Sequence, residues 1–140
     1  MGETGCGKTV LVNFLSQTLE IPLLTLDVDG GKTDEDVIEF MDRVVQTYDE
    51  QSEDGNGVLV FFDDINVANC MGLFKTLIID RMHRSVPLPH NIRLIMCCKP
   101  YRLRNHEFEA TDPMRRLVHR VHPLPESVID VVNDLSLIHI

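Results

Sequence analysis

The chain has 140 residues, which fits one domain rather than two and is long enough to bury a sizeable core. Hydrophobic residues make up 44% and charged residues 25%, as in ordinary soluble globular proteins. The net charge is −9, and residues 1–66 carry 15 acidic but only 3 basic side chains. This acidic balance excludes non-specific nucleic-acid binding, which needs a basic face. No apolar run is long enough to span a bilayer and there is no signal peptide, so we expect a cytoplasmic protein.

Helices and strands alternate along the chain. Apolar residues at helical spacing predict an amphipathic helix from Lys8 that ends before Pro22. Thr33 and Asp36 resemble a capping box that opens a second helix, which runs to the solvated acidic loop 49–57. A third helix is expected over 71–82, then a proline-containing loop over 86–89, and a last helix from Glu126.

Short apolar runs between these helices predict strands. They cover residues 23–28, 58–62, 92–98 and 117–121. Most are apolar on both faces, which is typical of a parallel sheet covered by helices on both sides. The predicted fold class is therefore α/β.

The cysteines and histidines show no metal or disulfide pattern. Cys6, Cys70, Cys97 and Cys98 lack a paired C-x-x-C spacing, so we expect reduced thiols. His119 and His122 lie three residues apart without a supporting carboxylate, so no metal site is predicted there.

A phosphate-binding motif opens the chain. The pattern G-x-x-x-x-G-K-[ST] is matched in full by Gly2, Glu3, Thr4, Gly5, Cys6, Gly7, Lys8 and Thr9. Glycines let backbone N–H groups curl around a phosphate, and the following helix N-terminus favours an anion. We expect Lys8 to reach the β- and γ-phosphates of a nucleotide and the Thr9 hydroxyl to ligate Mg²⁺.

Two carboxylates complete this predicted site. Asp63 follows the strand 58–62, at the carboxyl edge of the sheet, where it would hold Mg²⁺. Asp64 points elsewhere and could orient or deprotonate the attacking water. Alone, this pair would more often be two turn-forming acids; beside an intact phosphate loop, a site for MgATP is the better interpretation.

The motifs together resemble one family. GETGCGKT, DGGKT, FFDDIN, NCMGLFK, CCKPYRLR and LVHRVHPLPES are similar to AAA+ units of the mysterin family of giant ubiquitin ligases. The likeness runs from Gly2 to about Asp134. It implies a three-layer P-loop NTPase of the AAA+ type, with strand order 5-1-4-3-2.

The resemblance also implies site residues. ATP phosphates would lie on Gly5, Gly7, Lys8 and Thr9. Lys99 falls at the sensor-1 position, where the family usually has asparagine, and Asp64 falls where it usually has glutamate. Arg115 or Arg116 lies where AAA+ proteins often place an arginine finger that serves a neighbouring unit, although a solvated basic turn is the slightly better interpretation of these two residues.

The two departures leave the function open. Aspartate in place of glutamate withdraws the carboxylate of Asp64 by about 1.5 Å, and the Lys99 ammonium cannot accept a hydrogen bond from water. The chain is thus either an ATPase whose hydrolysis drives conformational change in a larger ligase, or a nucleotide-binding unit that hydrolyses poorly. A P-loop small-molecule kinase is disfavoured, because no acceptor-binding lid is recognisable.

The resemblance divides the chain as well. We expect residues 1–125 to form the AAA+ core without its first strand, and residues 126–134 to begin the lid helix. Residues 135–140 match a translated sequencing adapter and are left out of the fold. The expected partners are neighbouring AAA+ units, and ubiquitin machinery only through parts of the protein outside this chain. Expressed alone, the chain is predicted to be insoluble or molten, because a central strand is missing.

Overall fold

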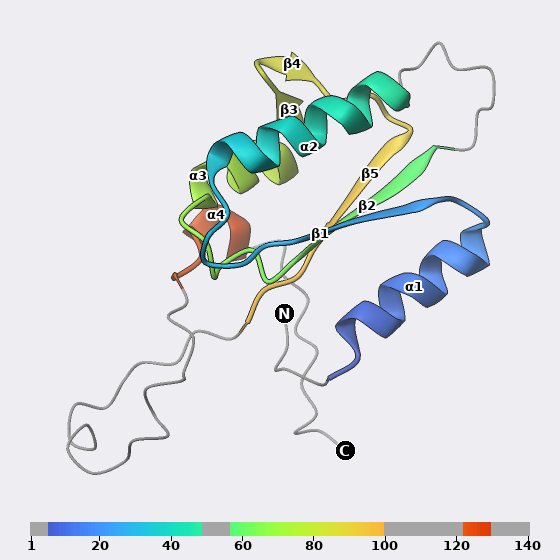
Figure 1. Cartoon of the computed structure of the whole chain (residues 1–140), viewed down its shortest axis with the longest axis horizontal. Helices are drawn as coiled ribbons and strands as arrows, with labels where there is room; N and C mark the ends of the chain where they lie inside the picture. The colour runs from blue at the N-terminus through green and yellow to red at the C-terminus, as the bar shows by residue number, and fades with distance from the viewer. Residues whose placement is uncertain (1–5, 49–56, 100–121, 130–140) are drawn as a thin grey trace.

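A three-stranded parallel sheet lies at the centre of the structure, a computed structural model that describes residues 6–48, 57–99 and 122–129 (Figure 1). Its strands are β1 (Leu23–Asp27), β2 (Val58–Asp63) and β5 (Ile92–Met96). They pair in the order β1-β2-β5, with β2 in the middle. The predicted parallel α/β sheet is confirmed. These strands are the second, third and fourth of the predicted sheet, and they neighbour one another as expected.

Strand β2 is buried on both faces, as its unbroken apolar run predicts. Val58, Val60 and Phe62 belong to the larger of two hydrophobic cores, whereas Leu59 and Phe61 belong to the smaller. Alternate residues of a strand point to opposite faces of a sheet, so the two cores lie on its two sides. The predicted strand 92–98 ends earlier, at Met96, although the Cys97 N–H still donates to the Phe62 carbonyl at 2.8 Å.

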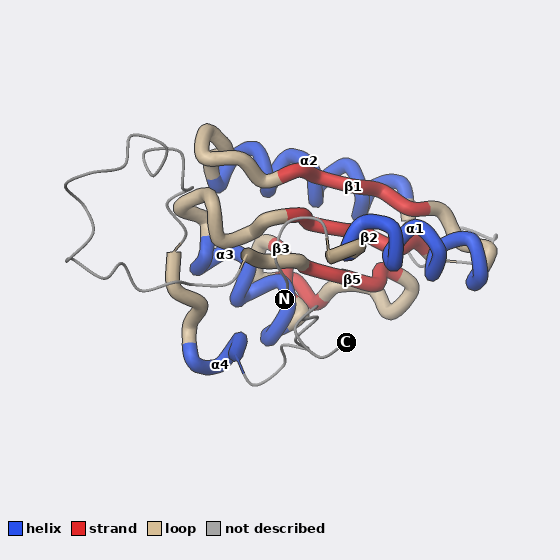
Figure 2. Tube along the Cα trace, turned by 90° about the horizontal axis from the view of Figure 1, so that it is seen from below, coloured by secondary structure: helices blue, strands red, loops and turns tan. Residues whose placement is uncertain are grey.

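Helices cover both faces of the sheet (Figure 2). α1 (Lys8–Leu19) contributes Val12 to the smaller core. α2 (Asp34–Thr47) and α3 (Met71–Lys75) pack on the other face and supply residues such as Met41 and Phe74 to the larger core. α1 follows the predicted phosphate loop, α2 follows β1 and α3 follows β2, so elements that alternate along the chain form alternating layers.

The predicted capping box at the start of α2 is confirmed. The Asp36 N–H donates to the Thr33 hydroxyl, and the Thr33 N–H donates to the Asp36 carboxylate at 2.8 Å. These bonds satisfy two of the amides that a helix start leaves unpaired. The hydrogen bond from the Thr33 backbone lowers the pKa of Asp36.

The predicted helix 71–82 forms as far as Asp80, but its second half is not α-helical. α3 passes into a π-helical turn, η1 (Thr76–Asp80), and Arg81 ends it with a left-handed φ of 55°. A hairpin of β3 (Met82–His83) and β4 (Val86–Pro87) follows, where the sequence predicted a helix end and a loop. The Arg81 guanidinium donates to the carbonyls of Pro89 and Ile92, and these bonds hold the hairpin against the start of β5.

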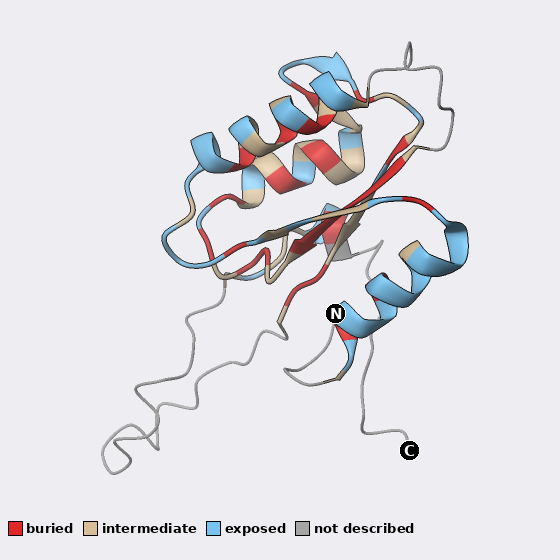
Figure 3. Cartoon of the chain, turned by 45° about the vertical axis from the view of Figure 1, so that its right-hand side comes forward, coloured by how far each residue is buried: buried red, intermediate tan, exposed pale blue. Residues whose placement is uncertain are grey.

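The amphipathic helix predicted from Lys8 forms, but its apolar side does not face the core. Most of α1 is exposed (Figure 3), including the five apolar residues whose helical spacing predicts the helix: Val10, Leu11, Phe14, Leu15 and Leu19. We call them the α1 apolar face. Lys8 and Val12 are the buried residues of this helix instead. Hydrophobic spacing therefore predicted the helix correctly, but it does not show which side of the helix meets the core.

Other predictions fall at or beyond the edge of the described ranges. α4 (Glu126–Ile129) begins at the predicted residue. The predicted strand 117–121 and most of the acidic loop 49–57 lie outside the described residues. Within the described ranges, none of the helices combines the length and apolar character that crossing a membrane requires.

Candidate functional site

The end of the predicted phosphate loop leads directly into α1. Gly7 precedes the helix with a left-handed φ of 85°, a conformation that favours glycine over residues with a Cβ. The Gly7 carbonyl accepts the first helical hydrogen bond, from the Leu11 N–H at 2.9 Å. Lys8 is only 8% exposed, and Cys6 is partly buried. Gly2, Glu3, Thr4 and Gly5 lie outside the described residues.

Thr9 and Asp63 come together although 54 residues separate them. The Thr9 hydroxyl donates to Asp63 Oδ2 at 3.2 Å. Asp63 Oδ1 is buried and has no hydrogen-bond partner among the described residues. A buried carboxylate oxygen without a partner costs free energy unless an ion or water completes it. A hydroxyl beside a carboxylate is also a donor set that suits Mg²⁺, so this pair fits a divalent cation.

Asp64, the second acid, forms an ion pair with Lys99. Lys99 Nζ lies 3.0 Å from Asp64 Oδ2, and the two side chains are 20% and 30% exposed. Asp64 has a left-handed φ of 56°, which aspartate tolerates better than most residues, and this turns the chain away from Asp63. The next residue, Ile65, donates its N–H to the Cys97 carbonyl at 2.9 Å. The turn thus carries Asp64 towards the end of β5.

A fully buried asparagine links these segments, and the sequence prediction missed it. Asn66 Oδ1 accepts the Lys99 N–H at 2.9 Å, and Asn66 Nδ2 donates to the Lys99 carbonyl at 2.8 Å. The Asn66 carbonyl accepts the His122 N–H at 2.7 Å. A single polar residue among Ile65, Val67 and Ala68 was the signal that could have revealed it.

Cys97 lies beside the same group of side chains. Burial raises its pKa to about 11, and the negative charge of Asp63 adds to this effect while Lys8 opposes it. The thiol is therefore protonated at neutral pH and unsuited to nucleophilic or metal chemistry. All four cysteines are free, and Cys97 and Cys98 belong to opposite cores.

Taken together, the structure groups Thr9 with Asp63, and Asp64 with Lys99, at the carboxyl ends of β2 and β5. Arg115 and Arg116, the two predicted arginine-finger positions, lie outside the described residues. No cluster of three or more histidine, cysteine or acidic side chains suited to a metal occurs within the described part of the chain. A cation held here would thus need ligands beyond Thr9 and Asp63, such as phosphate or water.

The class of protein is an α/β domain with a parallel sheet and polar residues gathered at its carboxyl edge. Comparison with known proteins gives the family: the model described as the RNF213 AAA domain matches residues 1–102. The chain belongs to the RNF213 AAA domain family, which confirms the resemblance to an AAA+ unit of a mysterin-type ubiquitin ligase.

Three relatives match 97% of the chain. It is 32% identical to the E3 ubiquitin-protein ligase RNF213 of Homo sapiens, and 30% identical to RNF213 of Mus musculus and to rnf213-beta of Danio rerio. The matched region spans only 3% of the length of each relative.

Proposed function

We propose that the chain is an AAA module that binds MgATP and hydrolyses it. The observation that carries this proposal is the hydrogen bond between Thr9 and Asp63, because it brings the last residue of the phosphate-loop motif to the acid that ends β2. The orphaned Oδ1 of Asp63 supports a cation at the same place. The finer fold that we propose is a three-layer P-loop NTPase with strand order 5-1-4-3-2.

Each residue has a role in this proposal. The loop amides from Gly2 to Thr9 would surround the phosphates, and the Lys8 ammonium would neutralise charge on the β- and γ-phosphates. Thr9 and Asp63 would hold Mg²⁺, which supplies charge neutralisation at the phosphates when bound. Asp64 would orient or deprotonate the attacking water.

The relatives' names extend the proposal to the whole protein. They are E3 ubiquitin-protein ligases, so hydrolysis here would drive conformational change within a larger ligase. The partners would be neighbouring AAA+ units, with Arg115 or Arg116 serving the adjacent site, and ubiquitin transfer would belong to other parts of the protein. The location would be cytoplasmic.

Calorimetric titration of the full-length protein with MgATP tests binding. Lys8→Ala removes the cation at the phosphates, so the number of bound MgATP molecules should fall by one. The matched control is Lys75→Ala, since Lys75 is an exposed lysine on α3. Unchanged stoichiometry in Lys8→Ala would contradict the proposal.

One observation favours a second function, nucleotide binding with poor hydrolysis. The ion pair with Lys99 occupies Asp64 Oδ2, the group that would handle water. Asp64 is also shorter than glutamate, and a misplacement of ~1 Å can cost on the order of a hundredfold in rate. Under this alternative, the unit would regulate or stabilise a neighbouring catalytic unit.

Phosphate release by the full-length protein separates the two functions. The hydrolysing unit predicts release that falls in both Lys8→Ala and Asp64→Asn. The alternative predicts that wild type and Lys8→Ala release phosphate equally. It also predicts that the double variant Asp64→Glu with Lys99→Asn gains Lys8-dependent release, by up to about a hundredfold.

A further inference from the structure

The Asn66 side chain makes its two shortest hydrogen bonds to the backbone of one residue, Lys99, and a longer one, of 3.5 Å, to the His122 carbonyl. Its amide oxygen accepts from the Lys99 N–H, and its amide nitrogen donates to the Lys99 carbonyl. Asn66 is fully buried, so these bonds are not exchanged for bonds to bulk water. The side chain thus pairs with the backbone N–H and carbonyl of Lys99, as a neighbouring strand would, although Lys99 lies three residues after the end of β5 at Met96.

This clamp has a direct consequence for the ion pair. Asn66 and Asp64 lie on the same turn after β2, and Lys99 meets both: its backbone at Asn66 and its ammonium at Asp64. The turn is itself fixed by two backbone hydrogen bonds: the Ile65 N–H donates to the Cys97 carbonyl, just after β5, and the Asn66 carbonyl accepts from the His122 N–H, before α4. The Asn66 amide and the Asp64 carboxylate are therefore both held in place beside Lys99.

We infer that Asn66 is a positioning residue, which acts through the Lys99 backbone to hold the Lys99 ammonium against Asp64. Only an asparagine-sized amide satisfies both Lys99 groups, because it carries one acceptor and one donor. This inference rests on the proposed function for its importance, since the ion pair controls Asp64. The hydrogen bonds of Asn66 and the Asp64–Lys99 ion pair form without nucleotide, so the positioning role can be tested without ATP.

Lysine labelling of the full-length protein tests the inference directly. In the wild type without nucleotide, Lys99 should react slowly with acetic anhydride, as quantified by mass spectrometry, because its ammonium is paired and largely covered. Asn66→Ala should raise the Lys99 labelling rate by roughly threefold, in keeping with the modest strength of a partly exposed ion pair. Exposed Lys75 is the internal control and should not change.

A second pair of variants distinguishes positioning from general structure. Asp64→Asn removes the ion pair and should itself speed Lys99 labelling. Adding Asn66→Ala to Asp64→Asn should then give little further increase, whereas a merely structural role for Asn66 would give an additive one. Additive rates, or an unchanged Lys99 in Asn66→Ala, would overturn the inference.

Asn66→Asp keeps the test valid if the alanine variant fails to fold. Its Oδ1 still accepts the Lys99 N–H, but its second oxygen faces the Lys99 carbonyl and repels it. Hydrogen exchange should show that the Lys99 backbone amide is still protected, while labelling of the Lys99 side chain becomes faster. Unchanged slow labelling of the side chain would refute the inference. The MgATP titration of Lys8→Ala does not depend on these labelling rates. Unchanged MgATP stoichiometry there would contradict the proposed function and leave the inference about Asn66 standing.

Discussion

The cysteines differ in their surroundings, and this predicts different reactivities. Cys6 is partly exposed, whereas Cys70 and Cys97 are buried and burial raises the pKa of each to about 11. At pH 8 only about 0.1% of such a thiol is the reactive thiolate. N-ethylmaleimide should therefore modify Cys6 first, and MgATP should slow this reaction if the loop binds phosphate. Peptide mapping measures both effects, with Cys6→Ser as control; prior labelling of Cys97 would contradict them.

At the same scale, the motifs indicated which residues gather at the site, but not the contacts that depend on a turn or on backbone groups. Thr9 and Asp63 lie within hydrogen-bond distance, and the phosphate-loop motif had assigned both to one magnesium site, which stays a prediction. The Asp64–Lys99 ion pair depends on the turn angle at Asp64, which spacing does not reveal. Asn66 was missed because its side-chain partners are backbone groups of Lys99 and His122, and backbone partners leave no sequence signal.

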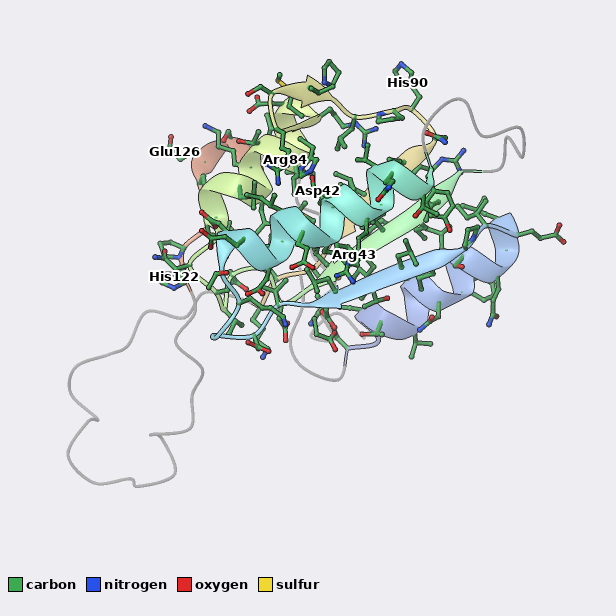
Figure 4. The ribbon with its side chains drawn as sticks, turned by 45° about the horizontal axis from the view of Figure 1, so that its top comes forward. Asp42, Arg43, Arg84, His90, His122 and Glu126 are labelled. Atoms are coloured by element: carbon green, nitrogen blue, oxygen red, sulfur yellow. The ribbon has the colours of Figure 1, made fainter. Side chains whose placement is uncertain are left out.

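Among the elements, the β3–β4 hairpin is fixed to α2 by one carboxylate (Figure 4). The Arg84 guanidinium donates to both oxygens of Asp42 at 2.8 Å, and His83 Nε2 lies 2.7 Å from Asp42 Oδ1. The hydrogen bonds from Arg84, and to a lesser extent that from His83, hold the pKa of Asp42 well below its usual range. A carboxyl group whose pKa is lower in the folded state than in the unfolded state stabilises the folded protein at pH values above the unfolded-state pKa. This stabilisation is lost as the pH falls through the folded-state pKa.

Asp42→Asn should therefore loosen the hairpin. At pH 7 we expect a lower thermal midpoint and faster amide exchange in β3, because the amide keeps the shape of the carboxylate but not its charge. The difference from wild type should shrink as the pH falls below about 4, where unfolded aspartate becomes protonated. Glu39→Gln, on an exposed position of the same helix, should leave hairpin exchange unchanged. Equal midpoints for Asp42→Asn and wild type at pH 7 would show that the ion pair contributes nothing.

The hairpin also shows a limit of sequence-based prediction for elements. Its turn places Arg84 and Ser85 at φ values of 48° and 62°, which normally indicate glycine or asparagine. Because neither glycine nor asparagine stands at these two positions, the sequence of residues 82–87 predicts a helix end and a loop instead of a hairpin. The capping box at Thr33 was predictable, because there the residue types and their spacing are themselves the structure.

For the whole molecule, the edges of the sheet and the α1 apolar face lack cover within the described residues. β5 pairs with β2 on one side and with no described strand on the other. The α1 apolar face is exposed, with Phe14 at 64%. An open strand edge and a contiguous apolar patch both favour self-association. The order β1-β2-β5 was predictable from the family resemblance, but the exposure of α1 was not, because hydrophobic spacing does not say which side of a helix meets a core.

These surfaces predict how the 140-residue chain behaves when expressed alone. Phe14→Lys should raise its soluble fraction and reduce binding of the dye ANS, because it replaces apolar surface with charge and removes no core contact. Phe74→Lys is the matched control: Phe74 is 1% exposed and packs edge-on against Phe62. A charge there should cost more than about 4 kcal/mol and lower the soluble fraction. Equal loss of soluble protein in both variants would mean that α1 buries Phe14 in solution, with its apolar side turned towards the sheet.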